Sequence, residues 1–232
     1  MKHPLYKALA FAVCVSCLAA FPGCSQHKNA DATAVIASSA AVQPESAPMP
    51  AARTETVRFS ASGDNLIHEG LYKSAARRAA ENPQCNQPYD FSYCYANMTD
   101  FYAGFDLNWI NQESLVNDAF EPSNYPRFST PGQMAWDLYN AGFRVVSVSN
   151  NHSYDKGSEG VSASMALWST LPADLAAVGF YDLQNHSPIV YKTINNIRIA
   201  FLSYTEMTNG ISTPAGSDYG VIYLDESDVI HE

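Results

Sequence analysis

The sequence predicts a layered α/β domain that begins near Arg53. One observation behind this prediction is that segments with helical spacing alternate with short apolar segments. A second is the β-branched segment 143–148 (FRVVSV), which is typical of a buried strand. A third is a pair of strands at 189–194 and 197–204, which Asn195-Asn196 can join as a hairpin, since asparagine tolerates left-handed backbone. Helices between strands, together with a hairpin, favour a layered α/β architecture.

The first elements of the domain follow from the same patterns. Residues 56–61 (TVRFSA) alternate polar and apolar side chains, which predicts a strand that stops at Ser62-Gly63-Asp64. Residues 66–80 are rich in helix formers and carry a basic outer face, and residues 105–110 form a second short apolar strand. Gly63 is expected to turn the backbone sharply and to aim Asp64 inward.

Two further helices are predicted from their end signals. Thr130 is expected to cap the first of them, and Pro131 fits the first helical position, where no N–H is needed. Gly142 ends that helix in a backbone conformation that only glycine adopts at low cost. Residues 158–170 form the second helix, and Pro172 stops its continuation.

The N-terminal residues are predicted to be an export signal and a tether. Residues 1–23 combine a short basic start with an apolar run that is too short to cross a bilayer, which indicates a secretory signal. Cys24 follows a small residue, as in a bacterial lipoprotein signal, and is expected to be lipidated; the alternative is a plain secretory signal. Residues 24–53 are rich in Ala, Ser and Pro and predict an unstructured tether to a membrane. The folded domain then comprises residues 54–232.

Charge and cysteine content limit the function further. The 232 residues carry a net charge of −10 without a basic cluster, which argues against nucleic-acid binding and suits a protein that gathers cations. Beyond Cys24, Cys85 and Cys94 remain, nine apart in a segment rich in proline and tyrosine. In an exported protein such a pair indicates a disulfide, and a metal-binding pair is the alternative.

Polar side chains follow three predicted strands at the point where each one ends. They are Asp64, then Asn111 and Glu113, then Asn150, Asn151, His152 and Asp155. In α/β sheets ligands bind beyond the carboxyl ends of strands, and carboxylate, amide and imidazole groups bind Mn, Mg, Fe or Zn. Taken singly, each group can also be a turn, a helix cap or a hydrogen-bonded structural residue. Their combination predicts one shared site for a divalent metal ion or a pair of ions.

Four segments resemble the CapA family of poly-γ-glutamate capsule synthesis proteins, which is similar in fold to the calcineurin-like metallophosphoesterases. They are SASGDNLIHEG (60–70), FDLNWINQES (105–114), FSTPGQMAWDLYNAGFRVVSVSNNHSYDKGSEGV (128–161) and NIRIAFLSYTE (196–206). The resemblance implies a layered β-sandwich flanked by helices, in which Asp64, Glu113 and Asn151 bind metal and His152 is the catalytic acid. Asn111, Asn150 and Asp155 would lie in the shell around them.

The sequence also departs from the family pattern. His68 lies four residues after Asp64, so the Asp-x-His opening of true phosphoesterases is absent, which argues against ordinary phosphatase activity. The later histidine motifs of the family are missing before Glu232. We therefore expect either a C-terminally incomplete fragment or a degenerate copy.

Together with the lipoprotein-type signal that ends before Cys24, the resemblance implies a protein that is lipid-anchored to a membrane of the bacterial cell envelope and exposed outside the cytoplasm. It would synthesise or attach an anionic capsule polymer such as poly-γ-glutamate, alone or with the synthesis machinery. Two alternatives stay open, namely a non-catalytic surface scaffold that keeps the fold and a metal-dependent phosphodiesterase.

Overall fold

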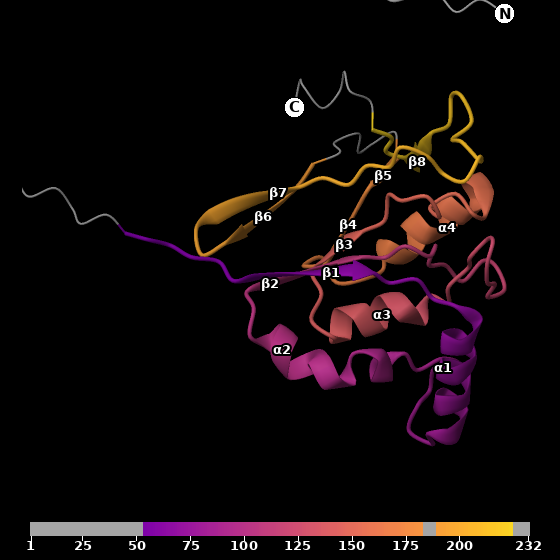
Figure 1. Cartoon of the computed structure of the whole chain (residues 1–232), viewed down its shortest axis with the longest axis horizontal. Coiled ribbons are helices and arrows are strands. Elements are labelled where there is room, and N and C mark those ends of the chain that lie inside the picture. The colour runs from indigo at the N-terminus through magenta and orange to yellow at the C-terminus, as the bar shows by residue number, and fades with distance from the viewer. Residues whose placement is uncertain (1–52, 183–188, 225–232) are drawn as a thin grey trace, which may run out of the picture. The chain divides into compact units, whose positions relative to one another are not determined.

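A computed structural model of the chain describes residues 53–182 and 189–224 (Figure 1), and all of them fall within one compact unit that starts at Ala51. The predicted signal, Cys24 and nearly all of the tether lie outside the described residues. In chain order the elements are β1 (Phe59–Asp64), α1 (Glu69–Glu81), η1 (Ser92–Cys94), η2 (Ala96–Met98), α2 (Thr99–Ala103), β2 (Leu107–Asn111), α3 (Gln133–Asn140), β3 (Val145–Ser147), α4 (Gly157–Trp168), β4 (Ala176–Val178), β5 (Phe180–Asp182), β6 (Val190–Ile194), β7 (Ile197–Phe201) and β8 (Tyr219–Val221).

The described part of the chain is built on a four-stranded sheet in the order β1-β2-β3-β4, with every neighbouring pair parallel. Two further pairs are antiparallel, β5 with β8 and β6 with β7. Parallel strands place their carboxyl ends at one edge, and the register pairs Asp64 with Asn111 and Asn111 with Ser147. The predicted α/β architecture is confirmed.

The two faces of the parallel sheet are covered differently. Helices α1, α2 and α3 lie on one face, and the β6–β7 hairpin lies on the other (Figure 1). The helical face is packed by buried residues such as Ile110, Val146 and Leu138. The hairpin places Ile199 and Phe201 against Leu107. Burial of these side chains is the main force holding the layers together.

The β6–β7 hairpin follows the sequence prediction closely. Asn195 and Asn196 have φ angles of 49° and 65°, the left-handed conformation that a two-residue turn between twisted strands requires. Gly142 also ends α3 as predicted, with a φ of 104°.

Two local predictions are wrong. The strand expected at 56–61 forms three residues later, so Asp64 is the last residue of β1, and Gly63 lies at a register irregularity without a left-handed φ. Thr130 does not cap α3: it is buried, and its hydroxyl donates to Ser114 Oγ at 2.7 Å. The helix begins after Gly132, whose N–H donates instead to Asp118 Oδ1 at 2.7 Å.

The expected Cys85–Cys94 disulfide is not formed in the described structure, where both residues are free thiols. The Cys85 thiol is directed at the carbonyl oxygen of Gln87, 3.6 Å away. Cys94 ends η1 and packs against the core, where burial raises the pKa of its thiol. The two sulfur atoms therefore have separate environments.

Candidate functional site

The polar residues named from the sequence lie at the carboxyl edge of the parallel sheet. Asp64 and Asn111 end neighbouring strands, and the Asn111 side-chain amide donates to Asp64 Oδ1 at 2.7 Å. Backbone bonds continue the sheet past the strand ends, from Asn65 N to Asn111 O and from Gln112 N to Ser147 O. The edge of the sheet thus presents Asp64 and Asn111 from neighbouring strand ends and Glu113 from the loop after β2.

Glu113 is an acid in an unfavourable environment for its charge. Its side chain is largely buried, and burial is the main cause that raises the pKa of its carboxyl above the ordinary value. The neighbouring carboxylate of Asp64 raises that pKa further, while His152 and His68 oppose the shift. The Glu113 carboxyl therefore retains a proton more readily than an exposed glutamate does.

His152 faces Glu113 and is held from behind by Asp155. His152 Nδ1 lies 2.7 Å from Asp155 Oδ2, and Nε2 lies 4.0 Å from Glu113 Oε1. Because an ionised carboxylate only accepts hydrogen bonds, the proton on Nδ1 points to Asp155, which leaves Nε2 to exchange a proton on the Glu113 side. Such an imidazole can act as a general acid or base.

Asp155 is fixed by the chain around it. Its Oδ2 atom also accepts the backbone N–H of Phe128 at 2.7 Å, and the Phe128 ring meets the His152 ring edge-on with 4.8 Å between centroids. Among the described residues, the buried Oδ1 atom of Asp155 has no hydrogen-bond partner. The two contacts to Oδ2 fix the Asp155 carboxylate behind the imidazole ring of His152.

A loop from the far end of the chain closes on this pair. Asn209 Nδ2 lies 3.2 Å from His152 Nδ1, and Asn209 Oδ1 accepts from the Asn151 amide at 3.4 Å. Asn150 Oδ1 accepts the backbone N–H of His152, and Asn150 Nδ2 donates to Gln112 O at 3.0 Å. Asn150 thus joins the loop after β3 to the loop after β2, and Asn151 joins it to the loop that carries Asn209.

His68 is the second imidazole of the site. Its Nδ1 atom lies 2.9 Å from Asn124 Oδ1, and its ring stands edge-on to Phe128 with 5.1 Å between centroids. Phe128 therefore lies between the rings of His68 and His152. In the sequence, the spacing of His68 from Asp64 departs from the family pattern. In the fold, His68 nevertheless lies close enough to Glu113 to lower the pKa of that carboxyl.

The described residues do not fit a complete metal site. Within residues 53–182 and 189–224, no group of three or more His, Cys, Asp or Glu side chains is placed to hold a metal ion. Asp64 and Glu113 can offer two carboxylates, whereas the Asn151 side-chain amide donates to Asn209 Oδ1.

Three residues of the site were missed in the sequence. Asn209 comes from a loop that lies 57 positions beyond His152, and nothing in its neighbourhood marks it. Phe128 and Asn124 precede the helix α3 in an irregular segment, where no periodicity applies. Only the fold brings these residues to the strand ends.

A match to a known protein family covers nearly all of the described residues. Residues 58–226 match the family model described as the bacterial capsule synthesis protein PGA_cap. That range includes all described elements from β1 to β8 and each site residue from Asp64 to Asn209. The chain belongs to this family. The PGA_cap family is related to the metallophosphoesterases, which suggests metal use in the family.

One curated relative matches over a shorter stretch. The capsule biosynthesis protein CapA of Bacillus anthracis is 34% identical over 68 residues, which is 28% of this chain and 16% of that protein. Membership of PGA_cap makes this a capsule-synthesis-related chain, which is consistent with a cell-envelope location. In the part of the chain that the structure describes, no helix has the length and apolar character needed to span a membrane.

Proposed function

We propose that this chain acts in the synthesis or attachment of an anionic capsule polymer such as poly-γ-glutamate, through proton transfer at His152. The observation that supports the proposal is the geometry of one group of side chains. His152 is held by Asp155 at 2.7 Å, and its other ring nitrogen faces the Glu113 carboxyl at 4.0 Å. A positioned imidazole beside a carboxyl of raised pKa provides an acid and a base within reach of one substrate.

The test compares two buried aspartates that have the same backbone contact. Asp155 Oδ2 accepts the Phe128 N–H at 2.7 Å, and Asp137 Oδ2 accepts the Phe91 N–H at 2.7 Å. Asp137 Oδ1 accepts from Gln133, and no histidine of the described residues is bonded to Asp137. Each Asp→Asn change should cost about 1–3 kcal/mol of stability. Capsule polymer per cell is measured in a deletion strain complemented with each variant.

We expect Asp155→Asn and His152→Asn to lower the polymer yield at least about tenfold, because a wrongly oriented or missing imidazole loses general acid–base catalysis. Asp137→Asn should keep the yield at equal protein level. Equal polymer yields from Asp155→Asn and Asp137→Asn would show that the His152–Asp155 pair has only a structural role.

A non-catalytic scaffold is the second candidate function. The observation that favours it is the lack, among the described side chains, of three metal-ligating residues placed together. In that case His152→Asn would leave the polymer yield unchanged, while deletion of the chain would abolish it.

A metal-dependent phosphodiesterase is the remaining alternative. Hydrolysis of bis(p-nitrophenyl) phosphate by the wild-type protein, and loss of that hydrolysis in His152→Asn, would support it.

The proposed metal use is tested separately from the polymer. We propose that Asp64 and Glu113 supply carboxylate ligands for a divalent cation, with further ligands from outside the described residues. Calorimetric titration with Mn²⁺ should then show binding that Asp64→Asn weakens. If the Asp64→Asn variant bound Mn²⁺ with the affinity of the wild type, Asp64 would not be a ligand of the cation.

We also propose that Cys24 is lipidated after removal of residues 1–23 and that residues 24–53 tether the domain to a membrane. The basic start, the apolar run and the small residue before Cys24 support it. Labelling with a radioactive fatty acid should mark the wild type and spare Cys24→Ser. A labelled Cys24→Ser protein would place the lipid elsewhere.

A further inference from the structure

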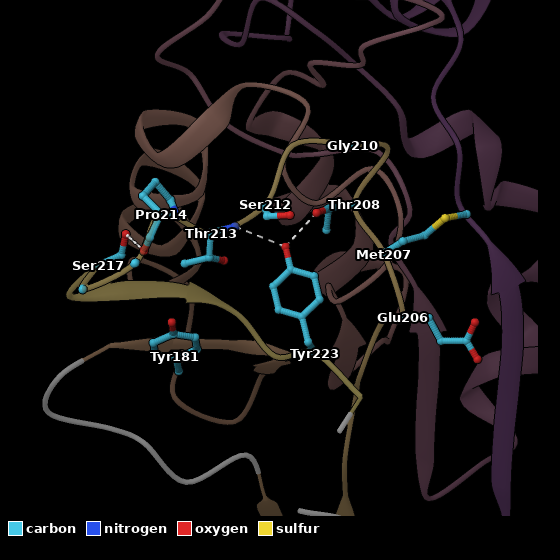
Figure 2. A pocket seen from close by; sticks show the side chains of 12 residues that line it. Tyr181, Glu206, Met207, Thr208, Gly210, Ser212, Thr213, Pro214, Ser217 and Tyr223 are labelled. Carbon is cyan, nitrogen blue, oxygen red and sulfur yellow. Dashed lines mark hydrogen bonds between the residues drawn. The ribbon is translucent and has the colours of Figure 1, made fainter. Parts of the chain in front are cut away.

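A pocket of about 580 Å³ lies beside the His152 site, formed by Tyr181 of β5, Tyr223 and the segment 206–217 (Figure 2). Its volume is in the range of small-molecule sites. The segment connects the pocket to His152 directly, because Thr208 and Gly210 line the pocket while Asn209 between them contacts His152 Nδ1 at 3.2 Å. The pocket and the His152 ring are therefore linked through residues 208–210.

The framework of the pocket is fixed by hydrogen bonds around Tyr223. Its hydroxyl lies 2.7 Å from Thr208 Oγ1 and accepts the backbone N–H of Thr213 at 3.3 Å, as Figure 2 shows. Thr208 Oγ1 donates in turn to Ile211 O. The aromatic ring of Tyr223 is thus held in one position across the pocket, so it is organised before any ligand arrives.

Close approach of β5 and β8 places another hydroxyl at the pocket wall. Tyr181 pairs with Gly220, and a Cβ atom added at Gly220 would lie 2.9 Å from the Tyr181 hydroxyl oxygen. Glycine at 220 therefore leaves room for the Tyr181 side chain. Ser212, which is exposed, adds a further hydroxyl at the rim.

The lining has a distinct chemistry. Its polar side chains are hydroxyls with one carboxylate, Glu206, and the described residues that line it include no Lys, Arg or His. Hydroxyls both donate and accept hydrogen bonds, and tyrosine rings offer apolar faces. A sugar ring has the matching surface, with a rim of hydroxyls and faces of C–H groups. An anionic chain would meet Glu206 without a compensating cation.

We propose that this hydroxyl pocket is a carbohydrate subsite next to His152 that binds an uncharged sugar and excludes the anionic polymer. The inference does not depend on the function proposed above, since binding is measured without turnover. A sugar bound here would contact the segment 206–217, which holds Asn209 against His152.

The experiment is titration of the isotope-labelled full chain, observed by NMR, with cellotetraose, maltotetraose and chitotetraose. A γ-linked pentaglutamate serves as the anionic comparison. We expect at least one neutral oligosaccharide to shift the amide signals of residues 206–217 and the ring signals of His152, and pentaglutamate to leave the 206–217 amides unchanged. Tyr181→Phe and Ser212→Ala should each weaken sugar binding about 3–10-fold, the effect of one lost hydrogen bond.

Tyr191→Phe is the matched control, because Tyr191 is an exposed tyrosine of β6 that stacks on Arg198 and does not line the pocket. Its sugar affinity should equal that of the wild type. Absence of binding by all three sugars up to about 10 mM, or wild-type affinity in both pocket variants, would overturn the proposal. Pentaglutamate binding at the 206–217 amides would do the same.

Discussion

At the scale of single residues, Glu113 makes the folded chain sensitive to pH. Its pKa is raised above the ordinary 4.5, first by burial and then by Asp64. Between the unfolded and the raised folded pKa, the folded state keeps a proton that the unfolded state has lost. The free energy of unfolding therefore falls as the pH rises through that window, and the loss persists at neutral pH.

The Glu113→Gln substitution should remove this pH-dependent loss of stability. We expect the variant to be more stable than the wild type at pH 7 by less than about 1 kcal/mol, because solvent screens a partly open carboxyl. The difference should shrink as the pH falls below the ordinary glutamate value. Urea unfolding between pH 4 and 7 with EDTA present measures it, and Glu121→Gln, at an exposed position, is the control. A variant that is less stable than the wild type at pH 7 would contradict the shift.

The site residues also show what a sequence can supply at this scale. Asp64, Asn111, Glu113, Asn150 and His152 were found because each lies at the end of a strand, and parallel strands bring such ends together. Asn209 could not be found this way, since its contact with His152 depends on the path of a long loop. The roles proposed for these residues remain predictions.

At the scale of elements, the turn of the β6–β7 hairpin is open to a direct test. Asn196 has a φ of 65°, where a β-branched side chain is strained and glycine is not. Asn196→Val should lower the free energy of unfolding by about 1–2 kcal/mol, and Asn196→Gly should leave it nearly unchanged. Equal stability of the two variants, measured by urea unfolding, would mean that the turn rearranges without cost.

Element length explains which strands the sequence revealed. The hairpin strands have five residues each, enough for alternation to show, whereas β4, β5 and β8 have three and were missed. β3 also has three residues, but its β-branched segment 143–148 marked it as a buried strand. The strand predicted at 56–61 begins three residues before β1. Polar and apolar residues alternate through both 56–59 (TVRF) and 60–63 (SASG), so the pattern does not mark the residue at which the strand begins. Thr130 carried a good cap signal, but its burial against Ser114 took precedence over local preference.

At the scale of the whole molecule, the net charge of −10 governs how the chain meets an anionic polymer. Like charges repel over about one Debye length, so dissolved salt weakens this repulsion. Association with poly-γ-glutamate should therefore strengthen when NaCl rises from about 20 to about 200 mM, the reverse of a protein that binds polyanions through basic side chains.

Sedimentation of labelled polymer with the purified chain across this salt range measures the effect. Mg²⁺ should act at lower concentration than Na⁺, since a divalent ion can bridge carboxylates of the protein and the polymer. Binding that weakens with salt would instead locate a basic contact surface and would contradict the argument from net charge. The Asp155→Asn variant should show the same salt dependence as the wild type, because one buried carboxylate changes the field of the whole chain little.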